Sequence, residues 1–594
     1  MSMVPRSWPE PAAEVVRAVR AKHYGRQVPL PVAVRDQFGE LFADAEFASA
    51  FGATGPKGWS PGRLALVTVF QMGENLTDRQ AAEAVRDRLS WAYALGLSLE
   101  DTGFDHTVLC EFRARVVEHG LEERVLDLLL ARLKEKGLVG AGGKQRTDST
   151  GVIAAVRDLN RLELAGESVR ALVEALSAAA PDWFAQVVDV PGWSRRYGRR
   201  IDSWKLPASR TKRDALALDY ARDGFALLEA LYAPGQPTWL REVPAAQVLR
   251  TVLLQNYTRT TASNGKQVVK RREKDTGEGG DGLPPGSSRL TSPYDTDARW
   301  SAKRGSFWNG FKVHISETCA TEADDAARPA PEPAAGPAGG RARDPKAGRA
   351  PSRPNLITSI ATTASTVPDG KALEGIHQSQ QRRGLLPGEH YLDSGYPSAE
   401  LITGSQARYG VALITPVLLN TSRQARAGTG FAADKFTIDW ENQQVTCPQG
   451  KVNASWSPCE QRGTPTIVVK FPRSDCGPCP VRDQCTTAKR GGRQLSLHPR
   501  LLTEALQQAR DRQETRDWQR DYALRAGVEG TIRQAAAVTG MHHARYRGIA
   551  KTHLEHVYSA TALNLLRLDA WWNGHALDRT RTTHLSRLEL ALAA

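Results

Sequence analysis

Two carboxylates in this chain stand in settings that suit metal-dependent chemistry. Asp148 lies in "RTDST", and Asp393 lies in "HYLDSGYPSAELI", between the end of a short strand and a Ser-Gly-Tyr-Pro turn. Taken singly, each is typical of a turn or cap residue. Taken together, two strands of one sheet that each present an acid can bring together oxygen ligands, which Mg²⁺ prefers. A pair of such ions can stabilise the attacking and leaving oxygens of a phosphoryl transfer.

A third carboxylate is expected beside such a pair, and Glu529 in "DYALRAGVEGTIRQ" is the best candidate. Four side chains would share one face of a helix here, at spacings of three, four and four: Tyr522, Arg525, Glu529 and Arg533. A surface ion pair is the alternative interpretation of Glu529. Gly527 and Gly530 weaken a helix, which indicates a close approach of a backbone or ligand, or a helix that begins near Val528.

The elements that must position these acids are the strands and helices of an α/β core. The segment "KQRTDSTGVIAAVRDLN" predicts a strand, a turn that holds Asp148, and a second strand. Further strands are predicted at 307–318, 355–366, 389–396 and 410–419, and helices at 369–387 and 498–536. A helix between consecutive strands is what a parallel pair requires.

The amino-terminal part is predicted to be helical between residues 60 and 136. Ser60 followed by Pro61 predicts a helix start, and "TDRQ" from Thr77 to Gln80 is a capping-box pattern. A compact bundle of this kind can hold a helix-turn-helix that faces DNA. The residues that would then contact DNA are Arg79, Arg86 or Arg88. A helical packing or dimerisation domain is the alternative.

The charge balance favours a polyanionic partner. The 594 residues include 79 Lys and Arg against 65 Asp and Glu, a net charge of +14, and nucleic acid is the first expectation for a large basic protein. Apolar runs such as "LALVTVF" are too short to span a membrane. The amino terminus lacks the apolar stretch of a secretory signal. We therefore expect a cytoplasmic, nucleoid-associated protein.

Cations and aromatic rings alternate in "WSRRYGRRIDSWKLPASRTKR" at 193–213, a combination that suits contacts with phosphates and bases. A solvated basic helix with buried aromatic residues would produce the same pattern. The candidate phosphate contacts in this segment are Arg195, Arg196, Arg199 and Arg200. The candidates elsewhere, with ordinary solvated charges as the alternative, are Lys303, Arg304, Lys312 and Arg533.

Five of the seven cysteines lie between residues 440 and 486. A C-x-x-C turn flanked by Gly and Pro lets two thiolates share one tetrahedral ion, and four sulfurs suit Zn²⁺. Only one such pair is present, so free thiols or an unfilled remnant of a zinc site are alternatives. The preferred ligands of a structural zinc ion are Cys447, Cys476, Cys479 and Cys485, with Cys459 in reserve.

The order of these blocks resembles bacterial insertion-sequence transposases of the DDE superfamily. The similarity rests on the Asp in "RTDST", the block "YDTDARWSAKRGSFWNGFKVHISET", the Asp in "LDSGYP" and a Tyr-x-x-Arg-x-x-x-Glu signature, with "LTDRQAAEAVRDRLSWAYALGL" and "FDHTVLCEFR" in the helical region. It covers about residues 30 to 570. The family signature continues with a Lys at the position that is Ala536 here, where Arg533, one turn earlier, is the substitute. Glu555 is a rival third carboxylate without the Tyr and Arg.

The resemblance implies a ribonuclease-H-like catalytic core, a mixed sheet with flanking helices. Asp148, Asp393 and Glu529 would be its catalytic, metal-binding triad for two Mg²⁺ or Mn²⁺ ions, with Tyr522 and Arg525 as partners of Glu529. The expected parts are a helical DNA-binding or dimerisation domain (1–136), the first core segments (140–160 and 291–420), a helical basic insertion (161–290), a disordered loop (320–354), a cysteine-rich insertion (421–497), C-terminal helices that complete the core (498–575) and a tail (576–594).

The implied activity is Mg²⁺-dependent cleavage of DNA at the inverted repeats of an insertion sequence, followed by strand transfer into target DNA. The ions would activate water at the element's end and stabilise charge on the scissile phosphate. Action on two ends implies a homodimer on DNA. The alternatives are an inactive, domesticated DNA-binding relative and a ribonuclease-H-like nuclease without strand transfer.

Overall fold

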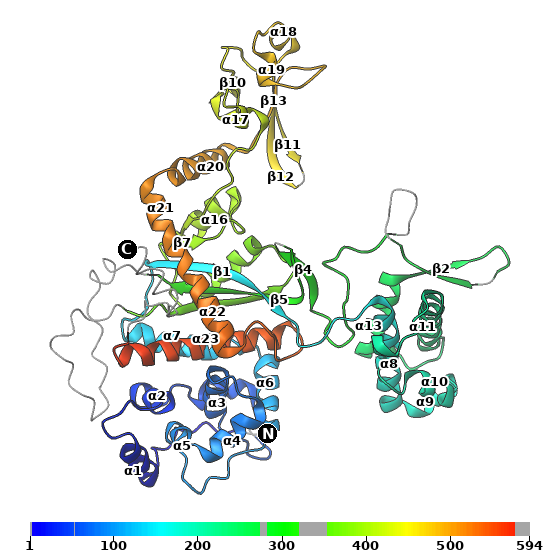
Figure 1. The fold of residues 1–594 in the computed structure, drawn as a ribbon, viewed down its shortest axis with the longest axis vertical. Helices are drawn as coiled ribbons and strands as arrows, with labels where there is room; N and C mark the ends of the chain where they lie inside the picture. The colour runs from blue at the N-terminus through cyan, green and yellow to red at the C-terminus, as the bar shows by residue number, and fades with distance from the viewer. Residues whose placement is uncertain are drawn as a thin grey trace, which may run out of the picture.

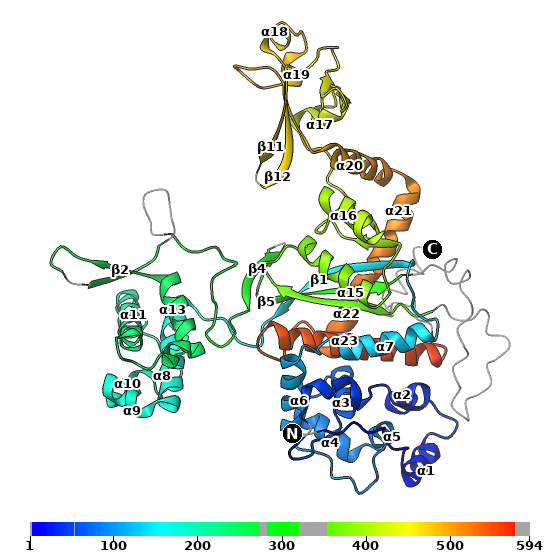
Figure 2. The same ribbon diagram turned by 180° about the vertical axis from the view of Figure 1, so that it is seen from behind.

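A mixed β-sheet lies at the centre of the molecule, with helices on both of its faces (Figures 1 and 2). The computed structural model describes residues 3–52, 54–265, 267–273, 282–303, 305–319, 353–461 and 463–575. The expected disordered loop at 320–354, apart from its last two residues, lies outside the described residues, as do the expected tail at 576–594 and Arg304.

The central sheet has six strands in the order β4-β5-β1-β7-β8, with β6 beside β5. Their bounds are β1 Lys144–Ile153, β4 Arg299–Lys303, β5 Ser306–Thr318, β6 Ile357–Ala364, β7 Glu389–Leu392 and β8 Ala412–Ile414. Strand β5 pairs antiparallel with β1, β4 and β6, whereas β7 is parallel to both β1 and β8. The α/β class and the parallel pair agree with the sequence pattern, although β8 is much shorter than the expected strand at 410–419.

The predicted turn at Asp148 is wrong, because β1 runs unbroken from Lys144 to Ile153. Strand β5 pairs with β1 along nearly all of that length, and Asp148 lies opposite Ile315 in the middle of the ladder. The Ser-Thr-Gly sequence looks like a turn, but its glycine has another use. A Cβ at Gly151 would come within 2.9 Å of the Trp308 ring, so the glycine lets an aromatic side chain lie against the strand.

The amino-terminal helices pack below the sheet and share its hydrophobic core. Their bounds are α1 Ala13–Lys22, α2 Leu30–Phe38, α3 Pro61–Gly73, α4 Asp78–Asp87, α5 Leu89–Leu95, α6 Thr107–Glu118 and α7 Arg124–Glu135. Ser60 caps α3 and Thr77 forms a full capping box with Gln80, as predicted. The long helix α23 (Ile549–Trp572) lies between these helices and the sheet and contacts both α3 and β6.

A helical unit with its own core is inserted between β1 and β4 and projects to one side (Figure 1). Its helices are α8 Arg161–Ala179, α9 Pro181–Val187, α10 Val190–Tyr197, α11 Arg210–Tyr232, α12 Trp239–Glu242 and α13 Pro244–Asn256. A hairpin of β2 (Tyr257–Thr261) and β3 (Gln267–Arg271) follows them. The sequence pattern predicted only helices here, so the hairpin was missed.

A small β-rich unit with a third core lies between β8 and the C-terminal helices. Its elements are α17 Arg423–Ala427, β9 Thr437–Asp439, β10 Gln444–Thr446, β11 Ser455–Gln461, β12 Thr464–Lys470, α18 Arg473–Cys476, α19 Arg482–Cys485 and β13 Gln494–Leu497. Helix α20 (Arg500–Gln513) leads the chain back toward the sheet (Figure 2). There the Gln513 amide both accepts from and donates to the Val417 backbone.

The remaining helices complete the layers around the sheet. On one face lie α15 (Leu373–Arg382) and α16 (Ala399–Tyr409); α15 is shorter than the helix expected at 369–387. On the other face the C-terminal segment consists of α21 (Arg516–Tyr522), the 3-10 helix η5 (Ala523–Ala526) and α22 (Gly527–Thr539). In the part of the chain that the structure describes, no helix combines the length and apolarity needed to cross a membrane.

Candidate functional site

The two strand-borne carboxylates lie side by side because of the register of a parallel pair. Strand β1 pairs with β7 so that Thr147 is opposite Leu392. The next residue along each strand is an acid, Asp148 on β1 and Asp393 just after β7. Neighbouring strands are only about 4.8 Å apart, so the register brings together two carboxylates that lie far apart in the sequence.

A single arginine connects all three candidate acids. Arg525 Nη2 lies 2.5 Å from Asp148 Oδ2 and 3.9 Å from Asp393 Oδ2, and its Nη1 lies 2.8 Å from Glu529 Oε1. Its own side chain is only 16% exposed. The structure therefore brings together the three acids that the sequence singled out, around one guanidinium group.

The helix that carries Glu529 begins at Gly527, which agrees with the predicted helix start near Val528. Gly527 is the first residue of α22, and Glu529 lies in the first turn. Arg146 of β1 explains the glycine, because a Cβ at Gly527 would fall 2.0 Å from its Nη1. That same Nη1 donates a 2.7 Å hydrogen bond to Leu524 O. This close approach fixes the start of α22 against the strand that bears Asp148.

The expected single helical face through Tyr522, Arg525, Glu529 and Arg533 is interrupted, since these residues lie in α21, η5 and α22. The expected contact of Arg525 with Glu529 still forms, whereas Tyr522 contacts other residues. Tyr522 Oη donates a 3.2 Å hydrogen bond to Leu392 O, the residue before Asp393. Its ring stacks on Trp518 with centroids 4.7 Å apart. Arg533 is exposed on α22.

The three carboxylates differ in their exposure to solvent. The side chains of Asp148, Asp393 and Glu529 are 9%, 19% and 57% exposed, so the site opens on the Glu529 side. Burial raises the pKa of Asp148, the Arg525 charge and the Ser149 backbone amide lower it, and the nearby Asp393 raises it; the net direction is upward. A cation bound between two such neighbouring carboxylates would relieve the repulsion between their negative charges.

The donor set fits a hard divalent cation in its chemistry, because all three candidate groups are carboxylates. Among the described residues, no group of three or more His, Cys, Asp or Glu side chains is arranged to hold a metal ion. The positive charge that satisfies the acids is the Arg525 guanidinium. Three carboxylates, one within β1, one just after β7 and one in the first turn of α22, are nonetheless the kind of oxygen ligands that Mg²⁺ takes.

Glu555, the rival third carboxylate, lies away from this site in the core below the sheet. It is fully buried on α23, and its Oε2 accepts a hydrogen bond from the Arg545 backbone amide at 2.8 Å. Burial raises its pKa to about 7. The structure therefore gives it no part in the cluster around Arg525.

The arginines of the basic segment at 193–213 lie on the surface of the helical insertion. The four candidates are all exposed: Arg195, Arg196, Arg199 and Arg200. Arg196 forms an ion pair with Asp223, and Arg200 Nε lies 3.4 Å from Asp202 Oδ1. Two of the four thus already have acidic partners within the insertion.

The aromatic residues of that segment divide between the two interpretations. Tyr197 is fully buried and donates a 2.7 Å hydrogen bond to Asp223, and Trp193 packs against it. Trp204, in contrast, is 78% exposed, and the Lys205 ammonium lies 4.5 Å from its ring centroid. Only Trp204 offers a free ring face beside a cation, the arrangement suited to stacking on a base.

The other basic candidates have different surroundings. Lys303 is exposed at the end of β4, and its charge lowers the pKa of Asp148, although burial and Arg525 affect that carboxyl more. Lys312 forms an ion pair with Asp369 at 2.9 Å, which occupies its ammonium inside the chain. In the amino-terminal helices, Arg79 and Arg86 are exposed at a shared cavity, whereas Arg88 pairs with Glu74.

Sequence reasoning named Lys312 as a phosphate contact but missed the polar residues around it on the face of the sheet opposite Asp148. Asp369, Ser149 and Lys312 form one hydrogen-bonded group there, and His314 Nδ1 lies 2.7 Å from Tyr396 Oη beside it. The only local sign of Asp369 was its position at the start of a helix. Its partners are 57 and 220 residues away along the chain.

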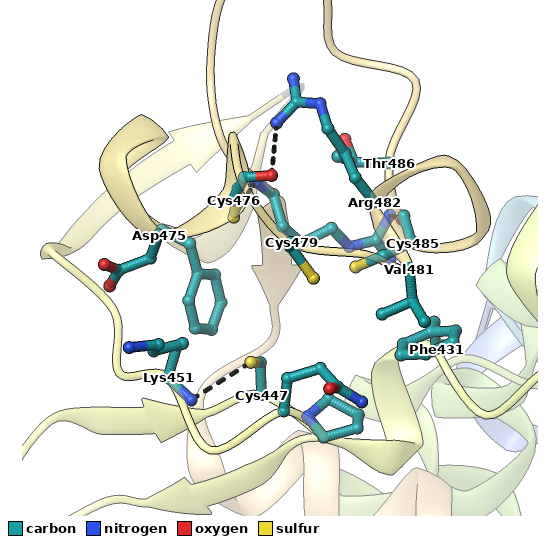
Figure 3. A pocket seen from close by; sticks show the side chains of 14 residues that line it. Phe431, Cys447, Lys451, Asp475, Cys476, Cys479, Val481, Arg482, Cys485 and Thr486 are labelled. Atoms are coloured by element: carbon teal, nitrogen blue, oxygen red, sulfur yellow. Dashed lines mark hydrogen bonds between the residues drawn. The ribbon is translucent and has the colours of Figure 1, made fainter.

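The four preferred cysteines line one pocket of the β-rich unit, as Figure 3 shows. They are Cys447, Cys476, Cys479 and Cys485. The backbone amides of Lys451 and Arg493 donate to the sulfurs of Cys447 and Cys476 at 3.3 and 3.4 Å. Burial raises the pKa of the Cys485 thiol, and the other three cysteines add to the rise, although the Arg493 charge opposes it. Cys459 is exposed on β11, outside the pocket.

Comparisons with known proteins identify two regions. Residues 446–569 match the family model "Transposase DDE domain", and residues 24–115 match "Transposase domain (DUF772)". The first match contains Tyr522, Arg525, Glu529 and the four pocket cysteines, and the second lies within the amino-terminal helices. No curated protein and no solved structure matches the chain. Both matched models describe domains of the same class of protein.

Proposed function

We propose that this chain, which belongs to the DDE-type transposases of insertion sequences, binds the terminal inverted repeats of its element and catalyses Mg²⁺-dependent strand cleavage and strand transfer there. The observation that carries the proposal is the meeting of Asp148, Asp393 and Glu529 on Arg525. These three acids span 381 residues of the sequence and meet beside the β1–β7 pair. The mixed sheet with helices on both faces supports a ribonuclease-H-like core.

In this proposal the three carboxylates hold divalent cations, and each protein group has a separate task. When bound, two Mg²⁺ or Mn²⁺ ions supply the positive charge that activates the attacking oxygen and stabilises the leaving one. Asp148 and Asp393 are fixed by the β1–β7 register, so they orient the ligand oxygens. Glu529, the most exposed acid, closes the site from the helical side. Arg525 is then available to a phosphate, which its planar fork suits.

Basic groups around the site supply the sequence-independent part of DNA binding. Lys303, exposed at the β4–β5 turn and close enough to influence Asp148, is placed to contact a backbone phosphate near the reacting bond. The exposed arginines of the helical insertion and Trp204 would extend that contact away from the sheet. Because an element has two ends, we expect two copies of the chain to act together on DNA.

The test of the proposal is to remove one carboxylate without changing its shape. Asp148→Asn should bind DNA that carries the element's ends as tightly as the wild type. It should lose cleavage in Mg²⁺ by about 10³-fold or more, since it removes a metal ligand and a transition-state charge. Gel shift and strand-nicking assays on the same labelled DNA measure the two properties separately.

Asp158→Asn is the matched control, because it changes an acid that follows β1 without touching the cluster. Its cleavage rate should remain close to that of the wild type. If Asp148→Asn cuts DNA at the wild-type rate, Asp148 has no place in the mechanism. Loss of both binding and cleavage would instead indicate a folding defect, which circular dichroism would reveal.

We propose further that the cysteine pocket binds a structural Zn²⁺. Four cysteines around one cavity, two of them accepting hydrogen bonds from backbone amides, form a donor set that suits this ion. Burial, and then the other three cysteines, raise the pKa of the Cys485 thiol. A bound cation would favour the deprotonated thiolate, which is the form that ligates zinc. The module would hold the β11–β12 hairpin rigid for contact with DNA.

Elemental analysis of the purified full-length protein tests the zinc proposal. Near-stoichiometric zinc is expected in the wild type and in Cys459→Ser, whose side chain lies outside the pocket. Cys479→Ser should lose most of the metal, because the altered residue supplies one of four sulfurs. A wild-type protein without zinc, or equal zinc in both variants, would remove the metal from this pocket.

A further inference from the structure

Asp369 is a buried carboxylate on the face of the sheet opposite Asp148. It begins the 3-10 helix η3 (Asp369–Ala372), and its side chain is 9% exposed. Its Oδ2 accepts a 2.9 Å hydrogen bond from Ser149 Oγ, and its Oδ1 accepts one of the same length from Lys312 Nζ. Ser149 follows Asp148 in β1, and successive side chains of a strand point to opposite faces. Asp369 therefore contacts the back of the strand that presents Asp148.

The same helix packs directly against the turn that carries Asp393. A Cβ at Gly370 would lie 2.8 Å from Tyr396 O, and a Cβ at Gly395 would lie 3.0 Å from Asp393 Oδ1 and 3.3 Å from Asp369 Oδ2. The Gly395 amide donates a 2.8 Å hydrogen bond to Asp393 Oδ1. The two glycines leave space for this close packing, so the position of Asp369 and that of the Asp393 turn depend on each other.

Lys312 fixes the other side of Asp369. It lies on β5, and its ammonium also donates a 2.9 Å hydrogen bond to Val367 O. Burial raises the pKa of Asp369, but the hydrogen bonds and charge of Lys312 and the Ser149 hydroxyl outweigh it and lower the pKa overall. The carboxylate thus stays ionised and bridges three elements: β1, β5 and the helix that supports the Asp393 turn.

We propose that Asp369 and Lys312 are a positioning ion pair, which holds Asp148 and Asp393 at the separation a cation needs and keeps the charge behind that site neutral. This inference rests on the proposed function, since it assigns a role toward the metal site of Asp148, Asp393 and Glu529. Neither residue is a metal ligand in this role. Asp369 works through the backbone of β1 and of the Asp393 turn, and Lys312 balances its charge.

Opposite changes of charge distinguish this role from simple structural support. Asp369→Asn leaves the Lys312 ammonium unbalanced behind the acids, so Mn²⁺ should bind more weakly. Lys312→Gln leaves the Asp369 carboxylate unbalanced, so Mn²⁺ should bind more tightly. Each change should be about threefold to tenfold, since solvent and salt weaken the interaction of one unit charge with an ion on the other face of the sheet. The double variant should return to within about twofold of the wild type, because the two charges cancel.

Electron paramagnetic resonance of free Mn²⁺, titrated with the full-length protein, measures this binding without any catalysis. Weaker Mn²⁺ binding in both single variants would show a structural role alone and overturn the proposed pair. Unchanged Mn²⁺ binding in both variants would also overturn the pair. Loss of one bound ion in Asp369→Asn that persists in the double variant would make Asp369 a ligand, which also overturns the proposal.

Two further variants keep the result interpretable. Ser149→Ala removes a hydrogen bond to Asp369 but leaves the charges of Asp369 and Lys312 in place, so it should weaken Mn²⁺ binding less than Asp369→Asn. Asp148→Asn tests the site itself. If Asp148→Asn binds Mn²⁺ like the wild type, or if the wild type binds none, the metal site of the proposed function fails and the pair fails with it. If Asp148→Asn loses binding while the opposite signs are absent, only the positioning pair fails.

Discussion

At the scale of single residues, Arg525 is the positive group that contacts all three candidate acids. Three carboxylates close together repel one another, and a cation among them favours their charged forms. The Arg525 guanidinium contacts all three acids while it is 16% exposed. A divalent cation that binds the same oxygens must compete with this group. If the proposed Mg²⁺ ions bind these carboxylates, Arg525 would stabilise the metal-free protein and lower the apparent affinity for Mg²⁺.

Arg525→Gln should separate these two effects. Without magnesium, the variant should melt about 2–5 °C below the wild type, because partly buried carboxylates lose a charged hydrogen-bond donor. Saturating Mg²⁺ should then raise its melting temperature more than it raises that of the wild type, since the competing charge is gone. Differential scanning fluorimetry with and without Mg²⁺ provides the measurement.

Arg533→Gln is the control for Arg525→Gln, since it removes an exposed arginine two turns further along the same chain segment. It should change neither the melting temperature nor the response to Mg²⁺. An equal Mg²⁺ response in Arg525→Gln and the wild type would mean that the guanidinium does not compete for the carboxylates.

At the scale of elements, the sequence predicted best those features that depend on neighbouring residues. The starts of α3 and α4 were predicted from Ser60 and Thr77, because each cap satisfies backbone amides within three residues of itself. The pairing of β1 with β5 was not predicted. Its Ser-Thr-Gly segment looks like a turn, and only the partner strand β5, some 160 residues later, keeps it extended.

Two acids of the candidate site were predictable because they lie near the ends of elements, whereas Asp148 lies within β1. Asp393 directly follows β7, and Glu529 lies in the first turn of α22. The group that supports them was not predictable, because it is made by contacts between distant elements. Glu317 of β5 is one example: it is fully buried and forms ion pairs with Arg146 of β1 and Arg567 of α23. Nothing local in the sequence indicates such a pairing.

At the scale of the whole molecule, the amino-terminal helices and the sheet behave as one body. They share a single hydrophobic core, and α23 lies between them. Glu123, at the N-cap position of α7, joins the layers. Its carboxylate contacts Arg382, the last residue of α15, and Arg383, which follows it, at 3.1 and 3.0 Å, and His553 of α23 at 3.3 Å. We therefore expect the stability of the whole body to depend on the charge of Glu123.

Glu123→Gln should lower stability at neutral pH and matter little in acid. Burial raises the pKa of Glu123, but the His553 hydrogen bond and the charge of Arg383 outweigh it and lower the pKa from 4.5 to about 2. A lowered carboxyl pKa stabilises the fold above about pH 4.5, and this contribution is lost as the pH falls toward 2. After allowance for partial exposure the loss is about 1–2 kcal/mol near pH 7. Thermal melts of the wild type, Glu123→Gln and the control Glu122→Gln, from about pH 7 to about pH 3, provide the measurement. Only Glu123→Gln should melt below the wild type, and this difference in melting temperature should shrink as the pH falls. A difference that is independent of pH would mean that Glu123 acts by packing and not by charge.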